Sequence, residues 1–590
     1  MGCLVSTVMA RRASADGKVL HGSDAQNNLH VVVVSALATA AAYATGYYWI
    51  NNSDTTTTKA KSSRSSSGSR NPFPVHSDPE KDREVYQKYH RDADGYPLKN
   101  TDKTLIWRDD GGLSKLVPLH PTAKTTTTKN NDNNTALPKY TMAQVAKRNT
   151  LAEAWIIIDE RVYDITNYIA KHPGGEKVLL NMLGKDCTDA FANYHAAAIY
   201  KKWLPLYLIG QVTDVPQYDH VQDFRAIRQE LLRRGLFETD PTYYQKMGLW
   251  YATLLVTALY LSLGCSSCLA HLTGAVVMGL FWQQLAGTGH DIGHSSVSHN
   301  FSQDNYYGAL YGTALMGISV GWWKRSHNVH HIVCNSIEHD CDIQHMPFLA
   351  VTPEIIKKPF WSTYHDKVIW MDWAARFFLK HQHIFFPFVM ALARFNLYAQ
   401  SYILLLTTDN SKSVVMNYRK EEFIGMGIFF TWVGLLCASL PTWGESLAWL
   451  LVSHAFTALL HIQITLSHFS METYHGSAYN NEDDEWYTMQ IKTTMNIDCY
   501  EWNDWFHIGL QYQIEHHLFP TLPRHNLPIA KKMVKEVCKK HGIHYHEVTF
   551  WQGILQTLAC LKATAMEVRA GNYDLVSGSA QIRDLMNAHG

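Results

Sequence analysis

Three short motifs rich in histidine stand in the second half of the chain and indicate metal chemistry. They read HDIGH at 290–294, HNVHH at 327–331 and QIEHH at 513–517. Residues three and four positions apart lie on one face of a helix, so each motif would present its imidazoles in a single direction. The imidazoles concerned are His290, His294, His327, His330, His331, His516 and His517.

The number of these imidazoles bears on which metal they suit. A single HxxxH motif is more often an ordinary helix surface than a metal site, but three such motifs together are hard to explain without metal. Zinc takes about four ligands in a closed or nearly closed tetrahedron. Seven converging imidazoles exceed one such site, and they suit two iron ions that keep positions open for oxygen.

A second histidine pattern lies further upstream in the chain. His172 opens the tetrapeptide HPGG at 172–175, and His195 follows 23 residues after His172. Two neutral imidazoles on opposite faces of a haem fill both axial positions of its iron, which then carries electrons rather than binding oxygen. The glycines of HPGG would let the backbone approach the porphyrin closely.

Four apolar segments must position the three histidine motifs. They form two hairpins, Leu249–Leu263 with Leu269–Ala286 and Phe423–Leu440 with Leu447–Leu466, and a span needs roughly 20 such residues. The turns within the hairpins contain no Lys or Arg, whereas basic residues flank the hairpins. By the positive-inside rule the turns face the lumen, so that all three motifs lie at the cytosolic membrane surface, where they can converge.

A fifth apolar run, Ile384–Leu406, carries Arg394 and Asn396 near its middle. A charge in the middle of a span is costly in lipid. If this run crossed the membrane, the motifs before and after it would also face opposite sides. We therefore interpret it as an interfacial or partly buried helix.

The N-terminal region has a different composition. Val31–Ile50 is uncharged and long enough to span a bilayer, so residues 1–50 form a possible targeting or signal-anchor segment. Tracts of Thr, Ser and Asn predict a disordered, low-complexity linker at 51–137. A compact domain is expected at 138–216, with short strands at 155–158 and 161–163. The formal net charge of zero gives no indication of nucleic acid as a partner.

The 138–216 domain resembles the cytochrome b5 family. The similarity rests on HPGG, on the spacing to His195, on DIT at 164–166 and on LYLIG at 206–210. The resemblance implies an α+β fold that binds haem b, with His172 and His195 as the axial ligands.

The region 217–560 resembles the superfamily of integral-membrane desaturases and hydroxylases, through its three histidine motifs. Gln513 at the start of the third motif, NDWFH at 503–507 and LFP at 518–520 are similar to the front-end desaturases, which carry a fused cytochrome b5 domain. This resemblance implies an all-α membrane domain with four main transmembrane helices, two non-haem iron ions and O2 as co-substrate.

The same resemblance assigns roles to two further residues. It implies that His468 is an additional iron ligand, although Ser467 stands where the family commonly has Asn. It implies that Gln513 orients the ligands rather than binding iron itself.

The sequence after the second motif bears on the substrate. Asp340 and Asp342 are general to front-end enzymes, but QHMP at 344–347 resembles the sphingolipid 8-desaturases more than the fatty acyl desaturases. QH at 382–383 with RFNL at 394–397 favours the same group. Three further histidines are expected to support the site rather than bind iron: His339, His345 and His383.

Together these resemblances predict an oxygen-dependent lipid desaturase. A mid-chain methylene has no polarised bond, so that a cofactor must supply the oxidising power. Electrons would come from an NADH-cytochrome b5 reductase through the fused haem domain, which a flexible tether would keep near the irons. The expected location is the endoplasmic reticulum membrane, with the haem domain and active site facing the cytosol and a C-terminal tail at 561–590.

Three other functions remain open from the sequence alone. The chain can be a front-end fatty acyl desaturase, with an acyl chain in place of a sphingoid base or ceramide. It can be a lipid hydroxylase, which a product assay would separate from a desaturase. It can also be a non-catalytic membrane haem carrier, which predicts haem but no non-haem iron in the purified protein.

Overall fold

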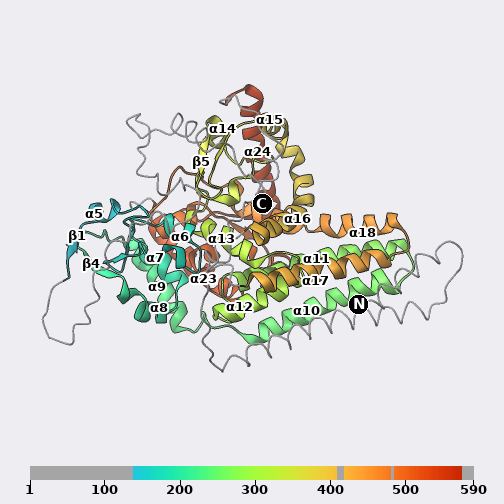
Figure 1. Ribbon diagram of the computed structural model, residues 1–590, viewed down its shortest axis with the longest axis horizontal. Helices are drawn as coiled ribbons and strands as arrows, with labels where there is room; N and C mark the ends of the chain where they lie inside the picture. The colour runs from blue at the N-terminus through green and yellow to red at the C-terminus, as the bar shows by residue number, and fades with distance from the viewer. Residues whose placement is uncertain (1–136, 408–417, 480–483, 574–590) are drawn as a thin grey trace, which may run out of the picture.

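The computed structural model describes residues 137–407, 418–479 and 484–573. Figure 1 shows strands and short helices at one end of the molecule and a bundle of long helices at the other. The expected targeting segment at 1–50 and all but the last residue of the expected linker lie outside the described residues. The same holds for residues 574–590 of the expected C-terminal tail.

A mixed sheet with the strand order β1-β4-β3-β2 forms the base of the N-terminal domain. The expected strands are confirmed, because β2 spans Trp155–Ile158 and pairs antiparallel with β3 at Arg161–Asp164. Asp159 and Glu160 between them have positive φ angles of 50° and 60°, as a two-residue hairpin turn requires. The other elements of this domain are β1(Lys139–Tyr140), α5(Met142–Ala146), η3(Ile169–Lys171), α6(Glu176–Leu180), α7(Thr188–Tyr194), α8(Ala197–Lys202), η4(Leu204–Leu206) and β4(Leu208–Val212).

Helix α9 (Asp219–Arg233) joins this domain to the rest of the chain. Its buried side packs against α23 (Leu527–His541), close to the third histidine motif. On its other flank, Arg225 donates two hydrogen bonds to the carboxylate of Asp189 in the N-terminal domain, at 2.7 and 2.8 Å. The expected flexible tether is therefore a packed helix, and it fixes the two parts of the molecule relative to each other.

Four long helical segments run side by side away from the N-terminal domain (Figure 1), and α11 packs against both α10 and α18. Each is long and apolar enough to cross a membrane. The two expected hairpins are thus present, and α11 continues through the first histidine motif. The segments are α10(Pro241–Leu259) with η5(Tyr260–Gly264), α11(Cys268–Gly293), α17(Arg419–Ser439), and α18(Trp443–Phe456) with α19(Ala458–Phe469).

A fifth described helix, α16 (Gln382–Thr407), also has the length and apolarity of a span, where the sequence led us to expect four main spans. Its Arg394 is fully buried and lies 4.2 Å from the centroid of the Trp282 ring. The guanidinium donates to the carbonyl oxygen of Met316 and to the Tyr398 hydroxyl, both at 2.6 Å. Protein rather than lipid therefore surrounds this charge. Three large apolar residues one turn apart are exposed on this helix: Ile384, Phe388 and Leu392.

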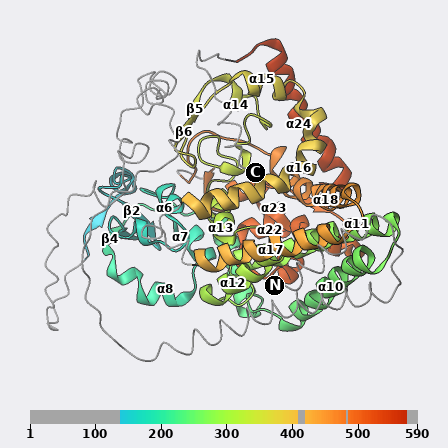
Figure 2. The ribbon, with the colours of Figure 1, turned by 45° about the vertical axis from the view of Figure 1, so that its right-hand side comes forward.

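The other two histidine motifs lie on short helices at the inner end of the bundle. α13 (Val320–Val333) carries the second motif and α22 (Gln513–Leu518) carries the third. In Figure 2 these two helices lie near the centre of the molecule, between α6 and α7 on one side and α10 and α11 on the other. The helices that carry the second and third histidine motifs are thus enclosed by both parts of the chain.

The remaining described elements belong to the second part of the chain. Among them, α24 (Phe550–Ala570) packs against α16 and α19, and it runs through residue 560, the expected end of the membrane unit. The others are α12(Phe301–Gly308), η6(Ala309–Ala314), η7(Cys341–Ile343), α14(Glu354–Lys357), β5(Phe360–Ser362), β6(Lys367–Ile369), α15(Trp373–Leu379), α20(Trp486–Lys492), β7(Asn496–Asp498), η10(Glu501–Asn503), α21(Asp504–His507), η11(Leu510–Tyr512), η12(Arg524–Asn526) and β8(Glu547–Thr549).

Candidate functional site

His172 and His195 face each other in the N-terminal domain. His172 follows η3 and His195 caps α7, and their ring centroids are 6.1 Å apart. An iron midway would lie about 3 Å from each ring centre, as metal–nitrogen bonds of about 2 Å require. His172 Nδ1 donates to the carbonyl oxygen of Gly175 and His195 Nδ1 to that of Phe191, each at 3.0 Å. Each Nε2 is therefore left with its lone pair for a metal.

Burial keeps both of these imidazoles neutral. It lowers the pKa of His172, against the opposing hydrogen bond to Gly175. Burial and the neighbouring His172 lower the pKa of His195 to about 4. The HPGG motif has a steric reason as well, since a Cβ on Gly174 would lie 2.8 Å from the His172 ring. The donor set and its geometry fit a haem.

Five imidazoles form a first group at the centre of the molecule, with ligand nitrogens that all lie within 4.8 Å of one another. They come from the end of α11, from α13 and from α22. His331 Nε2 lies 3.0 Å from His327 Nε2 and 3.1 Å from His516 Nε2. Two nitrogens bound at right angles to one metal at about 2.1 Å would be about 3.0 Å apart. The members of this first group are His290, His294, His327, His331 and His516.

Three more imidazoles and a thiol form a second group. Its ligand atoms also lie within 4.8 Å of one another, and its members are His330, His468, His517 and Cys334. The neighbouring residues His330 and His331 thus point into different groups, as do His516 and His517. Each HH pair contributes one imidazole to each group, which is why two helices can serve both. His468 comes from the end of α19, so that four separate segments of the chain meet here.

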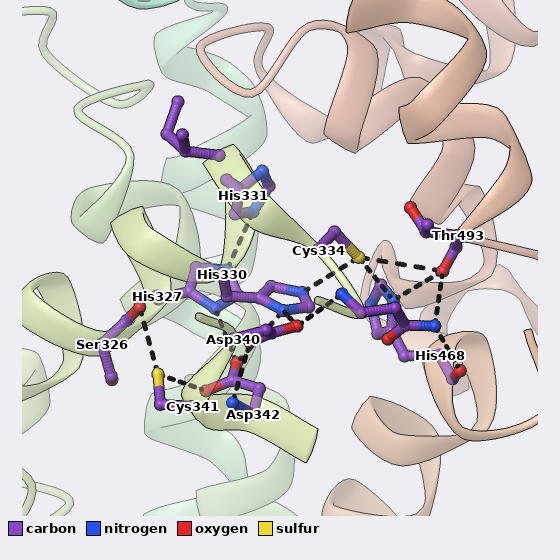
Figure 3. A network of polar contacts seen from close by, with 12 residues as sticks. Ser326, His327, His330, His331, Cys334, Asp340, Cys341, Asp342, His468 and Thr493 are labelled. Atoms are coloured by element: carbon purple, nitrogen blue, oxygen red, sulfur yellow. Dashed lines mark hydrogen bonds and ion pairs between the residues drawn. The ribbon is translucent and has the colours of Figure 1, made fainter. Parts of the chain in front are cut away.

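Side chains and carbonyls hold the ring orientations of the second group (Figure 3). His330 Nδ1 donates to Asp340 at 2.9 Å, and His468 Nδ1 donates to the carbonyl oxygen of Thr493 at 3.3 Å. His517 Nδ1 donates to Gln490 Oε1 at 2.9 Å. In a neutral ring, this arrangement leaves the Nε2 lone pair for a metal. The sequence motifs gave no sign of the roles of Gln490 and Thr493, because both lie far along the chain from the imidazoles that they hold.

Several ring nitrogens in the two groups are buried and have no hydrogen-bond partner in the described part of the chain. These are both nitrogens of His294, Nδ1 of His331 and Nε2 of His517. Buried polar atoms almost always have a partner, so unpaired ones indicate an absent ligand or ion. The residues therefore fit metal ions, one in each group.

The protonation of these imidazoles follows from burial and from their mutual proximity. Burial lowers the pKa of His294, His331, His516 and His517 well below the usual range, and neighbouring imidazoles lower it further. His330 differs: burial lowers its pKa, but Asp340, Cys334 and Asp342 together outweigh burial and hold the pKa of His330 well above the usual range. Metal binding by His330 would release its second proton.

The other residues singled out in the sequence differ in their surroundings. Gln513 and His345 line a cavity beside the two groups, together with histidines of both groups. His339 Nδ1 hydrogen-bonds Thr363 Oγ1 at 2.8 Å, and His383 lies on α16 outside the lining of this cavity. Gly293 in the first motif also has a packing role, since a Cβ there would lie 2.0 Å from the Trp323 ring.

A cavity of about 470 Å³ opens beside the two groups. Histidines of both groups line it, including His290, His330 and His468. Most of its other walls are apolar. A hydrocarbon chain fits such walls, and it would lie against both candidate metal positions. Among its apolar lining residues are Met316, Trp322, Val389, Leu392, Leu460 and Ile464.

Comparison with known proteins finds two families. Residues 266–549 match "Fatty acid desaturase" and residues 141–213 match "Cytochrome b5-like Heme/Steroid binding domain". The chain is 36% identical to Delta(8)-fatty-acid desaturase 2 of Arabidopsis thaliana over 76% of this chain and 98% of that protein. It is 39% identical to a Delta 8-(E)-sphingolipid desaturase of Emericella nidulans over 60% of this chain and 64% of that protein. It is 35% identical to the Acyl-lipid (9-3)-desaturase of Borago officinalis over 73% of this chain and 95% of that protein.

Proposed function

Because the chain belongs to the fatty acid desaturase family and carries a fused cytochrome b5-like domain, we propose that it desaturates sphingolipid long-chain bases at the 8-position. It is a membrane oxidoreductase that acts on lipid chains. The observation that supports the chemistry is the apolar cavity whose wall carries imidazoles of both metal-binding groups. An unactivated hydrocarbon placed there would lie next to the oxidising cofactor.

The proposed cofactors are haem b and two non-haem irons. His172 and His195 would hold the haem. The first group would hold one iron, and His330, His468 and His517 would hold the other. When bound, the two irons would supply the power to oxidise a methylene pair with O2, which the protein's own side chains lack.

The residues of the chain do the positioning. Asp340, Gln490 and the Thr493 carbonyl fix ring orientations, so that the Nε2 atoms of the second group point at a common position. The apolar walls align the lipid chain and exclude water, which would otherwise reach the reacting centre. Gln513, three residues before His516 on α22, also lines the cavity, in keeping with an orienting role.

Electron supply is supported by direct contact between the two parts of the chain. Asn328, within the second histidine motif, donates to the carbonyl oxygen of Gly174 in HPGG at 3.4 Å. Tyr194, adjacent to His195, has its ring centroid 6.4 Å from that of His331. We propose that electrons pass across this contact to the non-haem irons and that an NADH-cytochrome b5 reductase reduces the haem.

The membrane location is supported by the two apolar hairpins, whose four helical segments are each long and apolar enough to span a bilayer. We propose the endoplasmic reticulum, with the haem domain and all three histidine motifs on the cytosolic side. The absence of Lys and Arg from the turns at 264–268 and 441–445 supports this orientation.

The names of the relatives support more than one substrate. Relatives named as Delta(8) or sphingolipid desaturases and one named as an acyl-lipid desaturase match at similar identity. A front-end fatty acyl desaturase is therefore the second candidate. Expression in yeast, with long-chain bases and fatty acids profiled separately, tests the choice. New 8-unsaturated long-chain bases are expected, whereas a new fatty acid double bond with unchanged bases would overturn the proposed substrate.

A further inference from the structure

His461 is a buried histidine that belongs to neither metal-binding group. It lies on α19, is only 6% exposed, and lines the apolar cavity. It sits two helical turns before His468 on the same cavity-facing side, which places it about 10 Å from that imidazole along the helix axis. Ile464 and Thr465 line the cavity between the two histidines, and Leu460 lines it directly before His461.

The hydrogen bond that His461 already makes fixes which nitrogen carries its proton. Its Nδ1 lies 2.8 Å from the backbone carbonyl oxygen of Met390 on α16. A carbonyl oxygen can only accept, so Nδ1 of the neutral ring must carry the hydrogen. The Nε2 atom is therefore a bare acceptor.

This acceptor has no partner among the described residues. Of the described residues that line the cavity, only His294 and His461 carry a buried nitrogen without a partner, and His294 belongs to the first metal-binding group. The Thr465 hydroxyl, one turn away, already donates to the carbonyl oxygen of Ile462 at 3.0 Å. A buried acceptor left unpaired costs free energy, which a bound donor would recover.

We propose that His461 Nε2 accepts a hydrogen bond from a hydroxyl or amide N–H of the lipid substrate. The inference rests on the proposed function, and it makes His461 the residue that recognises a donor-bearing lipid. A long-chain base or ceramide carries such donors several bonds away from the carbons that react. The ester-linked end of an acyl chain carries only acceptors, which cannot bond to a bare nitrogen acceptor.

Lipid binding to the full-length holoenzyme tests this assignment. The probes are a saturated ceramide, its analogue without the 3-hydroxyl group, and its analogue with a methylated amide nitrogen. For the wild type we expect the parent ceramide to bind about ten-fold more tightly than the analogue that lacks the donor bonded by His461. A factor of about ten in affinity is what one buried hydrogen bond contributes. In His461→Phe, which keeps a ring but loses the acceptor, that preference should fall to within about two-fold.

His454→Phe is the matched control. His454 is another buried histidine of the bundle whose Nδ1 also bonds a backbone carbonyl, that of Leu450 at 2.8 Å. Its Nε2, however, is already paired with the Tyr398 hydroxyl at 3.2 Å, and it does not line the cavity. This variant should keep the wild-type preference among the three lipids, even if it lowers stability.

Two results would overturn the assignment: equal binding of all three lipids by the wild type, or an unchanged preference in His461→Phe. The first needs no variant, so it stands even if the substitution prevents folding. Failure of the proposed function looks different. In that case the wild type would desaturate acyl chains and leave long-chain bases unchanged, whereas failure of the His461 assignment alone would leave base desaturation in place.

Discussion

The proposed haem site and the two central histidine groups both consist of imidazoles, but they are assembled over very different lengths of chain. His172 and His195 are 23 residues apart, and carbonyls within four residues of each ring fix their orientation. The non-haem groups collect imidazoles from residues 290 to 517, and Gln490 and Thr493 hold rings that belong to other segments.

Because of this difference, we expect the two sites to fail independently and in different ways. The haem site needs only the fold of a small domain. The non-haem groups need α11, α13, α19 and α22 to pack correctly at the same time. Single substitutions can therefore remove each site without the other, and can measure how much the supporting residues contribute.

The largest expected effect is that of His331→Ala. His331 lies between His327 and His516 at 3.0 and 3.1 Å and stacks on His517 with ring centroids 4.0 Å apart. We expect non-haem iron to be lost and desaturation to fall by more than about 100-fold, beyond the loss typical for an outer supporting residue. Metal analysis and the haem absorption spectrum check this, and full non-haem iron in the variant would contradict the assignment.

The reciprocal change is His172→Ala. Removal of one proposed axial ligand should abolish the haem spectrum and nearly all NADH-driven desaturation, because the proposed electron path is cut. Non-haem iron per chain should remain close to wild type, since no residue of the two groups is altered. A parallel loss of non-haem iron would show that the two sites are not independent.

A smaller effect is expected from Gln490→Leu. The variant removes the acceptor for His517 Nδ1 but none of the candidate ligands. Iron affinity and activity should fall by about 10- to 100-fold, because the ring is no longer held in orientation. Gln382→Leu is the control, since Gln382 is equally buried but bonds only to the backbone of residues 350 and 561. Equal loss of iron in both variants would indicate a general folding defect.

The smallest effect is expected at the contact between the two parts. Arg225→Gln removes the paired hydrogen bonds to Asp189, in an ion pair whose side chains are 30% and 12% exposed. Such a partly exposed pair contributes about 1 kcal/mol or less, so re-oxidation of the haem by the non-haem site should slow only a few-fold. Stopped-flow spectroscopy measures this rate. Arg233→Gln, which alters a pair within α9, should leave it unchanged.

Much of the local structure could be predicted from the sequence. The strands at 155–158 and 161–163, the HPGG turn and the two apolar hairpins were all predicted, because each depends on residues close together in the chain. The family and the haem-binding type of the N-terminal domain also follow from such local motifs. The roles of the histidines as iron ligands remain predictions, which the clusters support.

Other features were decided only by the tertiary structure. The sequence could not assign His330 and His331 to different groups, find Gln490, or reveal that a packed helix rather than a tether joins the two parts. It also could not show that Arg394 is enclosed by protein, or that the Nε2 atom of His461 lacks a partner. These properties depend on which segments meet in space, and hydrophobic spacing along the chain constrains each segment's own shape far more than its choice of neighbours.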